Sequence, residues 1–173
     1  RAATERFLRG LRLAPADDFR AGFDGVLGGY LLLAGQPGLE LIESRYLSNP
    51  QSADGDVRHV LTALRFYHEY GHAIPRDQLD AAVAQLLNRP EFAEAAITDL
   101  ARFGAWTFLN RVVDVYRQDT SDARTRRAVV GYLLACPDQR AAVALTGLRA
   151  TDPQGIAAAE EVLSRTSSVG ASQ

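Results

Sequence analysis

The chain has 173 residues, of which 47% are hydrophobic and 23% are charged. This is the composition of an ordinary globular protein, and it excludes wholesale disorder. The formal net charge of −2 gives no overall electrostatic attraction to nucleic acids or anionic membranes, so we do not expect nucleic acid as a partner.

The first 15 residues carry four arginines around a few apolar residues. They could form a short basic amphipathic helix, but we expect a flexible, solvated arm over residues 1–15. Pro15 and Asp17 then predict the start of a helix. Glycines at positions 22, 25 and 28 remove side-chain bulk from one stripe of this helix, which favours close packing on a neighbour.

Residues 19–34 form the most apolar stretch, but Asp24 and four glycines interrupt it. The stretch is also shorter than the roughly 20 residues that span a bilayer, so we predict no transmembrane helix. The sequence begins at Arg1 and not at Met, so a signal sequence would be invisible and the compartment stays open, an exported protein included. The single cysteine, Cys136, allows no intramolecular disulfide and no cysteine-based zinc site.

From residue 38 onward, apolar residues recur at intervals of three and four, which indicates amphipathic helices that each bury one face. Prolines or short polar runs separate these stripes and predict helix ends and starts. The predicted buried faces are Leu39, Ile42 and Tyr46; Val57, Val60, Leu61 and Leu64; Leu79, Val83, Leu86 and Leu87; Phe92, Ala96, Leu100 and Phe103; Leu109, Val112, Val113 and Tyr116; Val129, Val130, Leu133 and Leu134; Leu145 and Leu148; and Ile156, Val162 and Leu163.

Short links between successive helices favour antiparallel neighbours, and no segment alternates polar and apolar residues as a strand would. We therefore predict an all-α fold, an α-solenoid of stacked antiparallel helix pairs that is closest to HEAT-type stacking. At this length we expect one domain over residues 1–163, followed by a disordered tail over residues 164–173.

Four stretches carry a resemblance to a known group of proteins: residues 63–66, 86–90, 99–106 and 129–137. Between about residues 57 and 160, the chain resembles uncharacterised bacterial HEAT-like repeat proteins, some of which are exported. The resemblance implies an α-helical repeat fold and no assigned activity. It favours a non-catalytic scaffold that binds another protein, or a subunit of a larger complex.

The segment His68-Glu69-Tyr70-Gly71-His72 matches H-E-x-x-H, in which two histidines one helical turn apart bind zinc and the glutamate activates the bound water. Residues 68–91 also resemble gluzincin metallopeptidases. That resemblance implies His68, His72 and Glu91 as zinc ligands and Glu69 as the general base. A zinc-dependent metallopeptidase is therefore the alternative function.

A structural role explains the same two histidines, because they continue the apolar stripe that ends at Leu64. Zincins present their substrate on the edge strand of a sheet, and no sheet is predicted here. Gly71 and Pro75 end the helix within about one turn of His72, which leaves a ligand pair with poor support. The HEAT-like proteins also carry other residues at the histidine positions. We therefore favour a non-catalytic protein without a cofactor, with zinc as the alternative.

Motifs for a nucleophile elbow, a P-loop or a dinucleotide-binding glycine loop are absent from the sequence. Arg124, Arg126 and Arg127 cluster at the start of a predicted helix, in the same region as Trp106 and Tyr116. Exposed Trp, Tyr and Arg side chains are typical anchors of protein interfaces. These five residues predict a binding surface for an acidic region of a partner, and a solvated face is the alternative.

Overall fold

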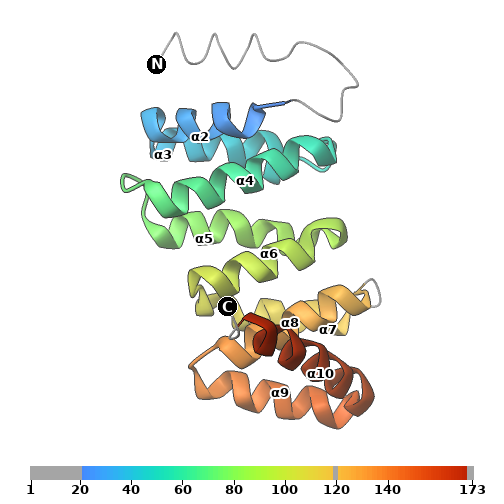
Figure 1. The fold of residues 1–173 in the computed structure, drawn as a ribbon. Coiled ribbons are helices and arrows are strands. Elements are labelled where there is room, and N and C mark those ends of the chain that lie inside the picture. Colours follow the sequence, from blue (N-terminus) through green and yellow to red (C-terminus); the bar gives the residue numbers. More distant parts are fainter. Residues whose placement is uncertain (1–20, 119–120, 171–173) are drawn as a thin grey trace. The chain divides into compact units, whose positions relative to one another are not determined.

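The computed structural model describes the backbone of residues 21–118 and 121–170, and the side chains up to residue 165. These residues form nine α-helices, labelled α2 to α10, and no β-strand, which confirms the all-α prediction (Figure 1). No helix in this part of the chain is long and apolar enough to cross a membrane. The predicted basic arm, residues 1–15, and the helix start predicted at Pro15 lie outside the described residues.

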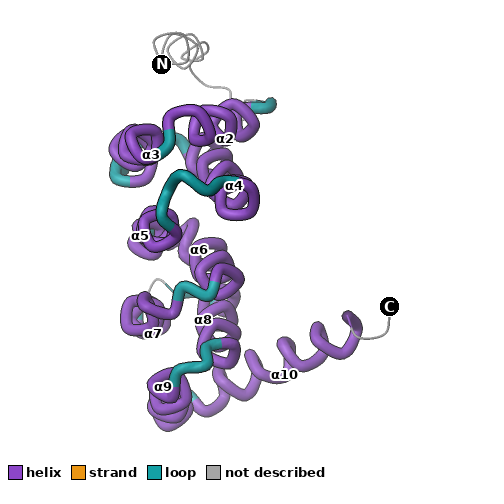
Figure 2. Tube along the Cα trace, turned by 90° about the vertical axis from the view of Figure 1, so that its left-hand side faces the viewer, coloured by secondary structure: helices purple, strands orange, loops and turns teal. Residues whose placement is uncertain are grey.

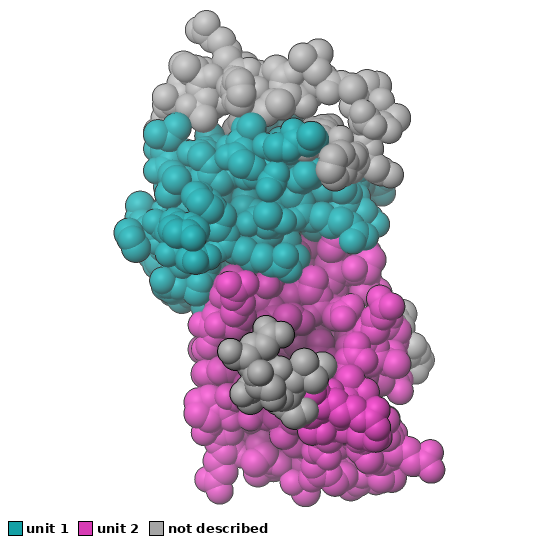
Figure 3. Space-filling model, viewed as in Figure 1, with its two compact units in different colours: residues 1–82 teal, residues 83–173 magenta. Residues whose placement is uncertain are grey.

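The chain divides into two compact units, residues 1–82 and residues 83–173 (Figure 3). The boundary falls inside α5 (Arg76–Gln85), within the region that the sequence assigns to a single domain. Each unit has its own buried apolar side chains, and each holds one of the regions that the sequence analysis singles out.

Unit 1 contains α2 (Phe23–Ala34), α3 (Gln36–Ile42) with a π-helical turn after it, α4 (Asp54–Tyr70) and most of α5. Helices α2 and α4 pack along each other, and the α4 stripe predicted from the sequence is buried. A Cβ atom at Gly28 would lie 2.9 Å from Cδ1 of Phe66. The absence of a side chain at Gly28 therefore lets the two helices approach closely, whereas a Cβ atom at Gly22 or Gly25 of the predicted stripe would have no packing neighbour within 4 Å among the described residues.

Unit 2 contains five α-helices, one of which, α8, is central: α6 (Pro90–Phe103), α7 (Leu109–Arg117), α8 (Ala123–Ala135), α9 (Gln139–Thr151) and α10 (Pro153–Gly170). Helix α8 packs against the other four. Helices α6 and α8 lie in one layer and α7 and α9 in another, while α10 leads away from α9 across α8 (Figure 2). This alternation places consecutive helices on opposite sides of the unit.

Local sequence signals fix the helix ends of unit 2. Pro90 occupies the first turn of α6, where its missing N–H leaves no hydrogen bond unmade. Asp122 and Asp138 cap α8 and α9 by accepting hydrogen bonds from the amides of Thr125 and Arg140, at 2.7 and 2.8 Å. Helix α10 continues to Gly170, into the region predicted as a tail.

Two predicted core residues of unit 2 lie on its surface instead. Leu134 is 53% exposed and Val162 is 38% exposed, whereas Leu133 and Ile156 of the same stripes are buried. Leu134 is the penultimate residue of α8, and Val162 is in the second half of α10. Helical spacing predicts a face, but the neighbouring helices decide how far along the helix that face is covered.

Candidate functional site

Helix α4 ends before the second histidine of the H-E-x-x-H segment. Its last residue is Tyr70, and Gly71 already has extended backbone angles, so His72 lies in the link that follows. His72 is exposed on this link. The two histidines therefore do not share one face of a helix, which is the arrangement that the zinc motif requires.

Tyr67 explains why the helix ends at this point. Its ring is fully buried, and its hydroxyl accepts hydrogen bonds from the amides of Ala73 and Ile74, each at 3.2 Å. Gly71 passes directly beside the ring, where a Cβ atom would overlap it. The glycine inside the motif is thus required by the packing of a tyrosine, with no need to invoke a ligand.

His68 faces a cation. The Nη1 atom of Arg76 lies 2.7 Å from Nδ1 and 2.8 Å from Nε2 of His68, so the guanidinium group is in contact with the imidazole ring. Oδ1 of Asp80 lies 4.0 Å from Nε2 of His68. Burial raises the pKa of Asp80 to about 6, although Arg76 acts in the opposite direction. A metal ion at His68 would lie beside this guanidinium cation, and the like charges would repel each other.

The other two residues of the predicted zinc site have separate roles. Glu69 is exposed, and the hydrogen bond that Tyr70 donates to it raises the pKa of Tyr70. Glu91 belongs to unit 2, where it lies in the first turn of α6 and pairs with Arg89 at 2.9 Å. A hydrogen bond from its own backbone amide and the contact with Arg89 lower the pKa of Glu91. Glu69 and Glu91 thus each interact with a neighbouring side chain of their own unit.

Two of the five residues predicted to form a binding surface belong to a network inside unit 2. Tyr116 is only 5% exposed, and its hydroxyl donates a 2.9 Å hydrogen bond to Oδ2 of Asp152. Nη1 of Arg126 lies 3.9 Å from the same oxygen, and its guanidinium lies over the Tyr116 ring. Burial, followed by the bond to Asp152, raises the pKa of Tyr116 to about 12. The network joins α7, α8 and the start of α10.

The other three predicted residues lie outside this network. Trp106 is half-buried, and its ring packs edge-to-face on Tyr132 with 5.0 Å between the centroids. Arg124 is exposed and Arg127 is half-exposed, and both line a hollow of about 280 Å³ between α6, α8 and α10. Of the five predicted residues, Tyr116 is therefore buried, and the other four keep partly or fully exposed side chains.

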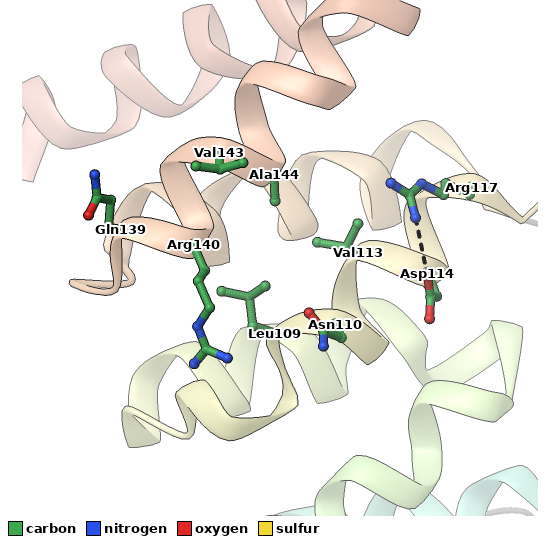
Figure 4. Close-up of a pocket in the computed structure, with 9 residues that line it drawn as sticks. All are labelled: Leu109, Asn110, Val113, Asp114, Arg117, Gln139, Arg140, Val143 and Ala144. Carbon is green, nitrogen blue, oxygen red and sulfur yellow. Dashed lines mark hydrogen bonds and ion pairs between the residues drawn. The ribbon is translucent and has the colours of Figure 1, made fainter.

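A groove that the sequence does not predict lies elsewhere in unit 2, between α7 and α9. It encloses about 500 Å³ (Figure 4). Its apolar lining comes from Leu109 and Val113 of α7 and from Val143 and Ala144 of α9. Val143 is 68% exposed, so its aliphatic side chain is open to a ligand that enters the groove.

The polar residues of this groove lie along its rim. Asn110 and Gln139 are exposed amides, and Asp114 and Arg117 form an ion pair with 3.4 Å between Oδ1 and Nη1. Arg140 donates two side-chain hydrogen bonds to its neighbour Asp138. The charged groups of the rim are thus already paired, and an apolar groove with a polar rim is suited to binding.

One sequence signal points to this groove in retrospect. In α9, Ala141, Leu145 and Leu148 are the buried residues, and Val143 does not belong to their stripe. An aliphatic residue off the buried face of an amphipathic helix has no partner within the fold. The opposite wall comes from a helix that begins thirty residues earlier, at Leu109, so the groove itself cannot be recognised from α9 alone.

Comparisons of the chain with protein-family models, with curated proteins and with solved structures find no match.

Proposed function

We propose that the chain is a non-catalytic helical-repeat module that binds another protein, either as a scaffold or as a subunit of a larger complex. In this proposal its helices form an α-solenoid of stacked antiparallel pairs of HEAT-like type. The two-layer alternation of α6, α7, α8 and α9 in unit 2 supports it. The observation that carries the binding function is the open apolar groove between α7 and α9.

The occupant we propose for the groove is an amphipathic helix of the partner. Two helices form the walls, and the channel between two helices accommodates the ridge of side chains on a third. The apolar face of that helix would cover Leu109, Val113 and Val143, and its polar edges would meet the amides of Asn110 and Gln139. Covering the exposed part of Val143 contributes about 1 to 2 kcal/mol to binding.

Photo-crosslinking from the groove tests this proposal. Val143 is replaced by p-benzoylphenylalanine, and the matched control carries the same substitution at Ala142, which is exposed on α9 but does not line the groove. We expect the position 143 variant to crosslink a discrete partner in native extract, and the crosslinked peptide to be an amphipathic helix. The position 142 variant should not capture this partner.

Substitution by a charged residue provides a second test of the groove. Val143→Glu places a carboxylate in the apolar groove, whereas Ala142→Glu places it beside the groove on the same helix. We expect Val143→Glu to lose the partner and Ala142→Glu to keep it, with no change in circular dichroism for either. Equal crosslinking from positions 142 and 143, or equal binding by the two glutamate variants, would contradict the proposal.

A further inference from the structure

A second accessible hollow lies on the other layer of unit 2, between α6, α8 and α10. Thr98 of α6, Arg124, Arg127 and Gly131 of α8, and Leu163 of α10 are among the residues that line its volume of about 280 Å³. Four of the nine residues that line the groove between α7 and α9 come from α9, and none of those lines this hollow. The two sites can therefore be altered independently.

The hollow has positive charge at one end. Arg124 and Arg127 are three residues apart on α8, so they lie on the same face of the helix within its first two turns. The positive end of the helix dipole adds to their field. Together they place two guanidinium groups where one acidic segment can reach both.

The carboxylates of unit 2 compensate the positive charge of Arg124 and Arg127 only in part. Arg126, on the same helix, is engaged by Asp152, but among the described residues Arg127 has no ion pair. The acidic neighbour of Arg124 is Asp122, which accepts the 2.7 Å hydrogen bond that caps α8 and whose negative charge partly compensates Arg124. Glu94 also lines the hollow and, within the described part of the chain, forms no ion pair with either arginine. The hollow thus contains two cations and one anion.

The opposite end of the hollow is apolar. Gly131 leaves space on α8, and the Leu163 side chain lies 3.6 Å from the position that a Cβ atom at residue 131 would occupy. Ala101 of α6 lines the same end. A ligand that spans the hollow would need negative charge at the start of α8 and an apolar side chain about two turns further along.

We infer that this hollow binds an acidic segment of a partner protein, with its carboxylates at Arg124 and Arg127 and an apolar side chain beside Leu163. The inference rests on the proposed protein-binding function, but it assigns a different site and a different partner chemistry. Carboxylates bind arginine through paired, charge-assisted hydrogen bonds, and the short apolar shelf fixes the direction of the segment.

A fluorescein-labelled peptide with a glutamate block followed by leucines serves as the probe, and fluorescence anisotropy measures its binding to the full chain. We expect saturable binding that weakens as salt is added. Arg127→Glu should weaken it by roughly tenfold or more, because a charge-assisted contact becomes a repulsion. Arg102→Glu is the matched control, since Arg102 is exposed on α6, does not line the hollow and changes the net charge equally.

The groove variant separates this inference from the proposed function. Val143→Glu leaves the hollow unchanged and should bind the peptide as the unsubstituted chain does, even if the groove proposal fails. The inference would be overturned by equal weakening in Arg102→Glu and Arg127→Glu, by the absence of binding to the unsubstituted chain, or by equal binding of a peptide with lysines in place of the glutamates. Circular dichroism of each variant shows that the helices remain formed.

Discussion

The hydroxyl of Tyr116 donates a hydrogen bond to Oδ2 of Asp152 across 2.9 Å, and this bond joins α7 to the start of α10. Asp152 also accepts a 2.9 Å hydrogen bond from the amide of Gly155, so the same carboxylate caps α10. Tyr116 and Asp152, which are 36 positions apart in the sequence, thereby hold the first turn of α10 against α7.

Tyr116→Phe is expected to lower the free energy of unfolding by about 1 to 2 kcal/mol, because the ring still fills its place but the bond to a carboxylate is lost. Urea denaturation measures the change. Tyr70→Phe is the control, since Tyr70 is 58% exposed and donates to the exposed Glu69. Equal shifts of the denaturation midpoint in the two variants would show that the Tyr116 bond is not important for stability.

The raised pKa of Asp80 makes the free energy of unfolding depend on pH. Burial raises the pKa of its carboxyl from 3.8 to about 6, so between these values the folded chain holds a proton that the unfolded chain releases. The contribution of Asp80 to the free energy of unfolding therefore falls as the pH rises through this window. At neutral pH the folded chain contains a destabilising buried carboxylate.

Asp80→Asn should remove this penalty. We expect the variant to be more stable than the unsubstituted chain by about 1 to 3 kcal/mol near neutral pH and almost equal to it near pH 4. Asp77→Asn, an exposed change on the same helix, should have little effect at either pH. Urea denaturation at the two pH values measures both variants, and a less stable Asp80→Asn variant at neutral pH would contradict the assignment.

The H-E-x-x-H segment gives a prediction about metal content. His68 faces Arg76, and His72 lies beyond the end of α4, so we expect the purified chain to bind clearly less than one zinc ion per molecule after exposure to zinc and desalting. Elemental analysis should give the same content for the unsubstituted chain and for His68→Ala. If the unsubstituted chain held about one zinc ion per molecule, and both His68→Ala and His72→Ala lost it, this result would favour the metallopeptidase alternative.

Much of the fold could be predicted from the sequence, because the apolar residues of each helix recur at intervals that identify its buried face. Val57, Val60 and Leu64 recur at helical intervals, and all three are fully buried in the structure. Prolines and capping aspartates likewise mark the helix starts. The exact end of α4 is harder to predict from the sequence. It depends on the hydroxyl of Tyr67, which accepts hydrogen bonds from amides of the link that follows the helix.

The candidate sites were harder to predict, because each depends on residues that are distant in sequence. Tyr116 and Arg126 resemble interface anchors in the sequence, but both contact Asp152 of the same unit, and Tyr116 is buried there. The groove between α7 and α9 exists because α8 packs against both helices and sets the space between them. A periodic pattern records which face of one helix is buried, and it carries no information on the distance to another helix.

Methyl NMR of the full chain tests the central claim, that the groove between α7 and α9 binds an amphipathic helix. The chain is labelled at leucine and valine methyl groups and titrated with the helical peptide identified by crosslinking at position 143, or with an idealised leucine and glutamate helix. The account predicts that the methyl signals of Leu109, Val113 and Val143 shift together, while those of Val57 and Val60 in unit 1 stay in place. Shifts confined to other methyl groups, or no shift at saturating peptide, would contradict it.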